Sequence, residues 1–277
     1  MRILVRAPVE RDLDSWQRLG WRAAPDLAGL MREHEAFRET LAAAGADVLE
    51  ARGEPGNLDS VYVYDPALLT PDGRAILLVP GKEGRRGEPE ALRPDLEAAG
   101  LTIAGALAEG EYAEGGDTVW LDDTTLLVGH TYRTNEAGIA ALERLLPDAD
   151  VRAFHLPHYR GRDEILHLRS LLNPISPNLV VAYLPLLPVP LVELLEEREI
   201  RIVEVPDAEF ESMGPNVLGL DDGRKALALA GNDETRRRLE AAGVEVLVYD
   251  GDEISRKGDG GPTCLTLPLP QTASVES

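Results

Sequence analysis

Amphipathic segments recur along the chain, each with apolar residues at three- and four-residue spacing, the period of one helix face. Short runs of β-branched and aliphatic residues lie between them and favour strands. Three segments end in Ala-Ala-Gly before such a run, at Gly45, Gly100 and Gly243, where glycine predicts a left-handed stop. The pattern predicts five helices, over residues 33–44, 88–99, 135–146, 188–198 and 233–242.

Polar turns flanked by strand-like runs recur at a spacing of roughly 50 residues. They lie at residues 70–73, 122–123, 173–177 and 221–223. A strand and then a helix follow each turn, so the sequence predicts an α/β fold of about five ββαβ modules. One module cannot bury its own apolar face, but modules arranged in a ring bury their faces mutually. A doubly wound sheet is the alternative, which the paired strands fit poorly because they indicate hairpins.

No stretch of the 277 residues is typical of a flexible linker, so we expect a single domain over residues 1–277. Residues 1–8 are expected to form the first strand, because they are too short and too charged for a signal peptide. Residues 13–31 fit no repeat. With Trp16 and Trp21 they form either a lid or a segment packed against the body.

The formal net charge is −21 and the isoelectric point is near 4.6, which excludes nucleic acid and anionic membrane surfaces as partners and favours a cationic ligand. Most of this charge is explained by a solvated acidic surface. No run approaches the 18 apolar residues of a membrane span. A single cysteine rules out an internal disulfide framework, so we expect a cytoplasmic protein.

That cysteine, Cys264, follows the turn Gly260-Gly261-Pro262-Thr263 and begins an apolar run. A thiol at the mouth of a strand is suited to act as a nucleophile. The alternative is a small buried hydrophobic residue, which is the commoner role of a lone cysteine.

Five histidines are candidates to serve the thiol. We expect His34 on the surface of a polar helical start. His155 and His158 are three residues apart, a spacing that suggests either a metal site or loop packing. His167 is expected on the polar face of a strand over residues 165–172.

Carboxylates gather at two further places. Asp59 and Asp65 are expected near the two ends of one strand over residues 59–66, and an aspartate before proline at such an end often faces a cleft. Glu114 begins the tetrad 114–117, whose two glycines let the backbone approach a ligand or simply form a turn.

Taken together, these segments resemble the dimethylarginine dimethylaminohydrolases, a family within the guanidino-modifying superfamily that includes arginine deiminases and amidinotransferases. The resemblance covers residues 57–269 and implies a five-bladed pseudo-symmetric α/β propeller. Six motifs carry it in order, residues 59–65, Arg85-Arg86, Glu114-Gly115-Gly116-Asp117, Tyr132-Arg133-Thr134-Asn135, Leu166-His167-Leu168-Arg169-Ser170 and Thr263-Cys264-Leu265.

The resemblance implies a hydrolase without metal or cofactor, whose partner is a small cationic guanidino amino acid; a homodimer stays open. Its site residues would be Cys264 as nucleophile, His167 as general acid and base, Glu114 and Asp65 on the guanidinium, and Asp59, Arg85 and Arg133 on the amino-acid end. Because nearby carboxylates raise a thiol's pKa, we expect the bound guanidinium and protonated His167 to generate the thiolate.

Three positions bear on the substrate. Arg169 stands where deiminases and amidinotransferases have an aspartate, close to the lysine of many dimethylarginine hydrolases. Tyr64 stands where that branch often has glutamate, and residues 82–84, Lys-Glu-Gly, replace the usual small residues.

Three functions follow from the resemblance. The first is hydrolysis of an Nω-substituted arginine to citrulline and an amine through a covalent thiouronium intermediate. The second is hydrolysis of unmodified arginine, or amidino transfer, on the same residues. The third is a non-catalytic binding propeller like the ribosome anti-association factors of this fold, which lack the Cys-His-Glu set.

Overall fold

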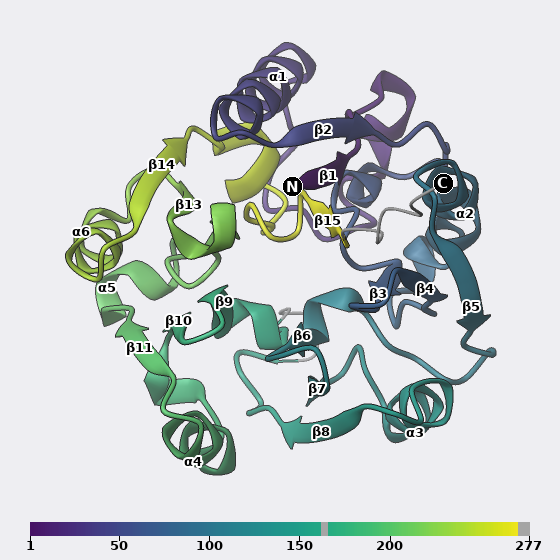
Figure 1. Cartoon of the computed structure of the whole chain (residues 1–277). Helices are drawn as coiled ribbons and strands as arrows, with labels where there is room; N and C mark the ends of the chain where they lie inside the picture. Colours follow the sequence, from purple (N-terminus) through teal and green to yellow (C-terminus); the bar gives the residue numbers. More distant parts are fainter. Residues whose placement is uncertain (162–165, 271–277) are drawn as a thin grey trace, which may run out of the picture.

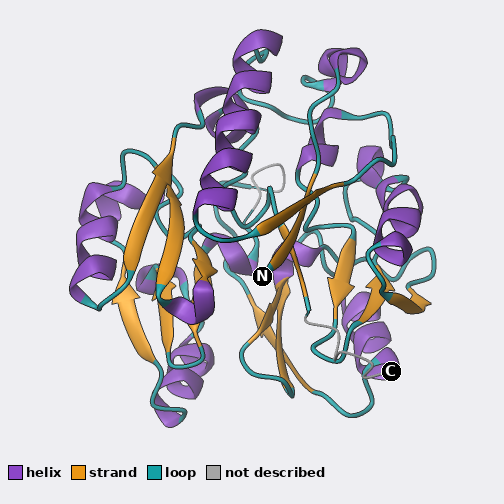
Figure 2. Cartoon of the chain, turned by 45° about the horizontal axis from the view of Figure 1, so that its top comes forward, coloured by secondary structure: helices purple, strands orange, loops and turns teal. Residues whose placement is uncertain are grey.

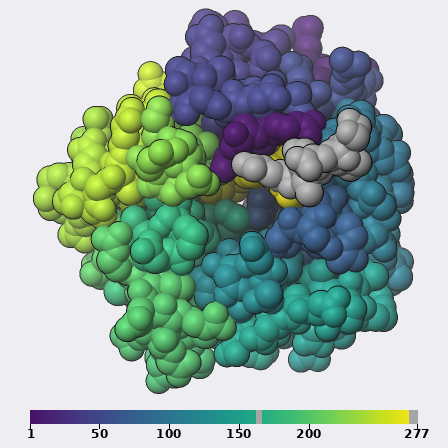
Figure 3. Space-filling view, viewed as in Figure 1, coloured from purple at the N-terminus to yellow at the C-terminus, as the bar shows by residue number. Residues whose placement is uncertain are grey.

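Fifteen strands form five three-stranded sheets in the computed structural model, which describes residues 1–161 and 166–270. The sheets stand around a common centre like the blades of a propeller, with the long helices on the outer rim (Figure 1). In the space-filling view the ring is hollowed at its centre (Figure 3). The predicted five-module α/β ring is confirmed.

Each blade has one topology, seen in β3 (Ala67–Leu69), β4 (Arg74–Leu77), α2 (Glu88–Ala98) and β5 (Thr102–Ala106). The first two strands form an antiparallel hairpin, and the helix then crosses over so that the third strand lies parallel to the second (Figure 2). Three blades repeat this order: β6 (Thr118–Trp120), β7 (Thr125–His130), α3 (Glu136–Leu145) and β8 (Asp150–His155); β9 (Leu172–Ser176), β10 (Leu179–Ala182), α4 (Val189–Glu197) and β11 (Arg201–Glu204); β12 (Leu218–Leu220), β13 (Lys225–Leu229), α6 (Asp233–Ala241) and β14 (Glu245–Tyr249).

The fifth blade joins the two ends of the described chain. It consists of β15 (Leu267–Leu269), β1 (Arg2–Val5), α1 (Leu27–Ala43) and β2 (Asp47–Glu50). β15 pairs antiparallel with β1, and β1 pairs parallel with β2, so the last strand takes the place that the first hairpin strand has elsewhere. This pairing closes the ring.

The five predicted helices are present, with ends within two residues of expectation except at the start of α1. That helix begins at Leu27 rather than at residue 33, because the Asp26 side chain accepts the Gly29 N–H at 2.7 Å and caps an extra turn and a half. The three predicted glycine stops all have positive φ, between 89° and 97°. A one-turn helix, α5 (Asp207–Phe210), was not expected.

Residues 59–66 do not form the predicted strand. A 3₁₀ turn, Leu58–Val61, takes their first half, and β3 begins only at Ala67. The alternating polar and apolar residues suggested a strand with one solvent-facing side. Residues 57–70 are instead buried throughout, apart from half-buried Tyr64, so neither side faces solvent. Both aspartates of this segment, Asp59 in the turn and Asp65 after it, are buried.

Two predictions beside β9 are also wrong. His167 does not lie on a strand over residues 165–172: it precedes a 3₁₀ turn, Leu168–Ser170, and residue 165 lies outside the described residues. Most of the turn expected at 173–177 belongs to β9. A proline is tolerated there because β9 is an edge strand of its sheet.

Residues 13–31 pack against the body, as one of the two alternatives predicted. Trp21 is 4% exposed and stacks on Tyr62 with ring centroids 6.0 Å apart. His34, expected on the surface, is instead buried on α1, and burial lowers its pKa to about 4. None of the described helices is long and apolar enough to cross a membrane.

Replacing Asp26 tests the cap that begins α1. Asp26→Ala removes the acceptor for Gly29 N–H and should lower the free energy of unfolding by about 1 kcal/mol, whereas Asp26→Asn keeps an acceptor and should change it by a few tenths, about 0.3 kcal/mol. Urea unfolding of both variants measures the difference. Equal losses in the two variants would show that the side chain does not act as a cap.

Candidate active site

Glu114 lies just before β6 with no exposed surface, although it carries a charge. Three donors compensate its burial: His167 Nε2 at 2.8 Å from Oε2, and the Lys82 N–H at 3.1 Å and Arg133 Nη1 at 3.2 Å from Oε1. Burial alone would raise the pKa of Glu114, but the hydrogen bond from His167 and the charge of Arg133 outweigh it and hold that pKa well below its usual range. The carboxylate is therefore ionised and fixed.

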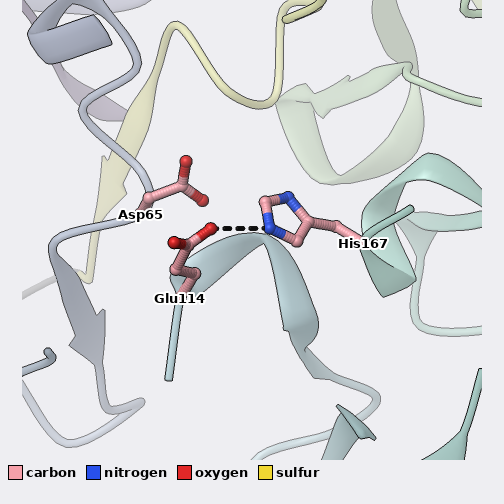
Figure 4. Close-up of side chains that lie close together, drawn as sticks. All are labelled: Asp65, Glu114 and His167. Carbon is pink, nitrogen blue, oxygen red and sulfur yellow. Dashed lines mark hydrogen bonds and ion pairs between the residues drawn. The ribbon is translucent and has the colours of Figure 1, made fainter. Parts of the chain in front are cut away.

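His167 reaches Glu114 from the loop before β9 (Figure 4). Asp117 fixes this loop: its carboxylate accepts the Leu168 N–H at 3.1 Å and the Thr131 hydroxyl at 2.6 Å. Burial disfavours the charged imidazolium, but Asp117, Glu114 and Asp65 outweigh burial and raise the pKa of His167 to about 9. The ring is thus protonated at neutral pH and able to donate a proton.

Asp65 lies just before β3 and faces the same space (Figure 4). Its Oδ1 accepts the Gly116 N–H at 2.8 Å and its Oδ2 accepts Arg85 Nη1 at 2.5 Å. One oxygen or nitrogen from each of Asp65, Glu114 and His167 lies within 4.8 Å of the others. Such a set could take a divalent cation or the planar donor fork of a guanidinium.

Arg85 lies beneath this cluster rather than at an open end of the site. Its side chain is 4% exposed and forms a bidentate pair with Glu88, at 2.9 and 2.8 Å, besides holding Asp65. It also donates to the Tyr62 carbonyl. In this structure the guanidinium positions Asp65 and the turn that carries it.

Asp59 and Arg133 lie on either side of the loop that follows β4. Asp59 Oδ1 accepts Trp21 Nε1 at 2.7 Å, and Oδ2 accepts the Lys82 ammonium at 2.5 Å. Arg133 is partly exposed and keeps its contact with Glu114. Both charges are therefore already paired without a ligand.

Cys264 lies just before β15 and is half-buried. Asn216 orients it: Oδ1 accepts the Thr263 N–H at 3.0 Å, and Nδ2 donates to Sγ at 3.5 Å. Burial, and after it the charge of Asp65, raise the pKa of the thiol to about 11. Cys264 and His167 line one cavity of about 70 Å³ with Asn216.

The site is built from equivalent positions of the five blades. The turn before each blade's first strand delivers one side chain to the centre: Asp65 before β3, Glu114 before β6, His167 before β9, Asn216 before β12 and Cys264 before β15. The structure thus brings the predicted nucleophile, acid and carboxylates to one face of the ring. Sequence reasoning missed Glu88 and Asn216 altogether, and it named Trp21, Lys82 and Asp117 without giving them these contacts.

The histidines at 155 and 158 belong to a neighbouring cavity of about 290 Å³. His155 Nδ1 lies 2.8 Å from His130 Nδ1, and His158 Nδ1 lies 2.7 Å from the Tyr132 hydroxyl. The two residues that the sequence pairs therefore have different partners, which fits loop packing better than a shared metal.

Comparisons with known proteins agree with this geometry. A family model described as "N,N dimethylarginine dimethylhydrolase, eukaryotic" matches residues 24–271. The N(G),N(G)-dimethylarginine dimethylaminohydrolase of Pseudomonas aeruginosa is 29% identical over 248 residues, 88% of this chain and 89% of its own. An arginine deiminase of Mycobacterium marinum is 31% identical over 187 residues, 56% of this chain and 46% of its own.

Solved structures show the same fold. A cysteine-to-serine mutant of the Pseudomonas aeruginosa enzyme, complexed with citrulline, superposes with a TM-score of 0.77 at 26% identity and covers 96% of this chain and 98% of its own. The N-terminal domain of ArgZ, a cyanobacterial arginine dihydrolase, has a TM-score of 0.80 at 20% identity, covers 97% and 98%, and supports the fold alone. With the family model matching most of its length, the chain belongs to the dimethylarginine dimethylaminohydrolase family.

Proposed function

We propose that the protein hydrolyses the guanidinium group of an Nω-substituted L-arginine, releasing citrulline and an amine. The observation that carries the proposal is the central cluster of Glu114, Asp65 and protonated His167, with Cys264 lining the same cavity as the imidazole. Two carboxylates match the donor fork of the planar cation, and a thiol and an acid lie beside them to act on its central carbon.

The reaction then divides into two steps on these residues. Asp65 and Glu114 hold the guanidinium while Cys264 Sγ bonds to its central carbon, and the C–N bond to the substituted nitrogen breaks as His167 gives that nitrogen a proton. The neutral imidazole next takes a proton from water, whose oxygen bonds to the same carbon. The C–S bond breaks as the hydroxyl group on that carbon gives its remaining proton to solvent, leaving citrulline, the thiolate and reprotonated His167. No metal enters either step.

The thiolate is supplied by the substrate. A thiol with a pKa near 11 is almost fully protonated at neutral pH, and His167 is already charged and cannot accept its proton. A bound guanidinium adds a positive charge beside the sulfur and lowers the thiol pKa, so the proton leaves to water on binding. The free protein is therefore kept unreactive toward other electrophiles.

The amino-acid end of the substrate is assigned to the loop region around Asp59 and Arg133. Asp59 would pair with the α-ammonium, and Arg133, which is partly exposed beside Glu114, with the α-carboxylate. Arg85 supports Asp59 from below by holding Asp65 and the backbone of the turn of residues 58–61.

Hydrolysis of unmodified arginine is the second candidate. The similarity to arginine deiminases favours it, although it spans 56% of this chain against 88% for the Pseudomonas aeruginosa enzyme. Residues Tyr64 and Arg169 bear on the choice: Arg169 stacks on the Tyr64 ring at 4.2 Å and donates to its hydroxyl at 2.6 Å. Tyr64 therefore places no second carboxylate next to Asp65, where the dimethylarginine hydrolases often have glutamate.

Replacing the nucleophile tests the reaction itself. Cys264→Ser should abolish citrulline release from dimethyl-L-arginine while still binding it, because the serine hydroxyl is a far weaker nucleophile in this site. Colorimetric citrulline detection and amine release measure the two products. Undiminished citrulline release by the variant would contradict the mechanism. In the unaltered protein, a specificity constant for arginine that exceeds the one for dimethyl-L-arginine would favour hydrolysis of unmodified arginine.

The thiol's pH dependence tests the role of the substrate charge. Because Cys264 is the only cysteine, iodoacetamide alkylation reports it alone, and the rate in the free protein should keep rising above pH ~9. Mass spectrometry of quenched samples follows the reaction, with Cys264→Ser as the unlabelled control. A plateau below pH 7 would mean that the free protein already holds a thiolate.

A close contact at Gly116 tests the placement of His167. A Cβ at Gly116 would lie 2.3 Å from His167 Nδ1, so Gly116→Ala must push the imidazole away from Glu114 and should lower kcat about 100-fold. Gly87→Ala is the matched control, because a Cβ there meets nothing within 4 Å and φ is −80°. Steady-state citrulline assays compare them, and full activity in Gly116→Ala would show that this position of the ring is not needed.

A further inference from the structure

Lys82 lies in the loop between β4 and α2, in the segment 82–84 where the sequence replaces the small residues usual in the family. Gly81 before it presses on the backbone of Arg133, where a Cβ would lie 2.7 Å from the carbonyl oxygen. The backbone N–H of Lys82 donates to Glu114. The main chain of the loop is therefore held between two site residues.

The Lys82 side chain points the other way and is largely buried, at 16% exposure. Its ammonium lies 2.5 Å from Asp59 Oδ2 and also donates to the backbone carbonyl of Leu19. The second oxygen of Asp59 is taken by the Trp21 indole. One of the protein's own side chains thus places an ammonium group between the Asp59 carboxylate and the Leu19 carbonyl.

We propose that Lys82 is an internal occupant of the substrate-ammonium site, which the α-ammonium of the substrate must displace. The inference rests on the proposed function, which assigns Asp59 to that group. Lysine and an α-amino acid present the same charged group, so one can replace the other on Asp59 and Leu19 without changing the charge of the site. Lys82 is then a specificity-determining residue that sets KM for substrates carrying an α-ammonium.

The displacement needs only side-chain rotation. Burial lowers the pKa of Lys82, so the ammonium regains hydration when its four-carbon stem swings outward. Its backbone N–H keeps its bond to Glu114 throughout, so the catalytic carboxylate stays in place. Lys82 therefore affects substrate affinity far more than the chemical step.

Binding to catalytically inactive protein tests the inference. Cys264→Ser and the double variant with Lys82→Met are titrated by calorimetry with dimethyl-L-arginine and with its analogue lacking the α-amino group. Removing Lys82 should lower the dissociation constant of dimethyl-L-arginine about tenfold, because Asp59 loses the cation in direct contact with Oδ2 and only Arg85 remains, 3.9 Å away. The analogue, which has no ammonium to place, should change less than about threefold.

Two further variants keep the result interpretable. Lys82→Gln keeps a hydrogen-bond donor without the charge, and it should also lower the dissociation constant, so it replaces Lys82→Met if that variant folds poorly. Lys225→Met on β13 is the control for the loss of a lysine in another blade. In the active protein, Lys82→Met should lower KM for dimethyl-L-arginine with kcat within about threefold.

The outcomes separate the two proposals. Suppose that the unaltered protein releases citrulline but that both Lys82 variants bind dimethyl-L-arginine no more tightly. This result overturns the role of Lys82 and leaves the proposed function standing. An equal gain for both ligands also overturns it, because the effect would not depend on the ammonium. A protein that neither binds nor hydrolyses dimethyl-L-arginine overturns both.

Discussion

A charged carboxylate with no contact to solvent, Glu114, is the constraint around which the centre of the ring is arranged. Burying it without partners would cost several kcal/mol, on the order of the net stability of a domain. Its partners come from different parts of the chain: an imidazolium from the loop before β9, a guanidinium from the turn after β7 and a backbone N–H from the loop after β4. Each blade that contributes a partner is fixed relative to the others by the same charge.

The pKa values of Glu114, His167 and Cys264 are shifted in different directions by the same set of buried charges. Burial penalises every charge, so each group takes the protonation state that its neighbours stabilise. His167 has three carboxylates around it and holds its proton to about pH 9, whereas burial and then the charge of Asp65 make Cys264 keep its proton to about pH 11. The buried carboxylates of the cluster therefore favour a cationic ligand over a neutral one.

The modular fold was predictable because its signals are local. Glycine stops such as Gly100 are set by neighbouring residues, and the recurring polar turns together with the five helical segments give the number of modules. The true path of residues 59–66 was not, because a segment buried on both sides gives no alternation to read. Asn216 carries no motif at all. Only the equivalence of the five turns, which the ring imposes, shows that a side chain just before β12 must reach the centre.

The pairing of β15 with β1 links closure of the ring to the placement of the proposed nucleophile. Cys264, the proposed nucleophile, lies three residues before the strand that closes the ring, and its backbone carbonyl accepts the Tyr64 N–H in the neighbouring blade. During synthesis four blades emerge before the thiol does, so an unfinished or truncated chain has an open ring and no reactive sulfur. Reactivity therefore arrives only with the last strand, and an incompletely made molecule is chemically silent.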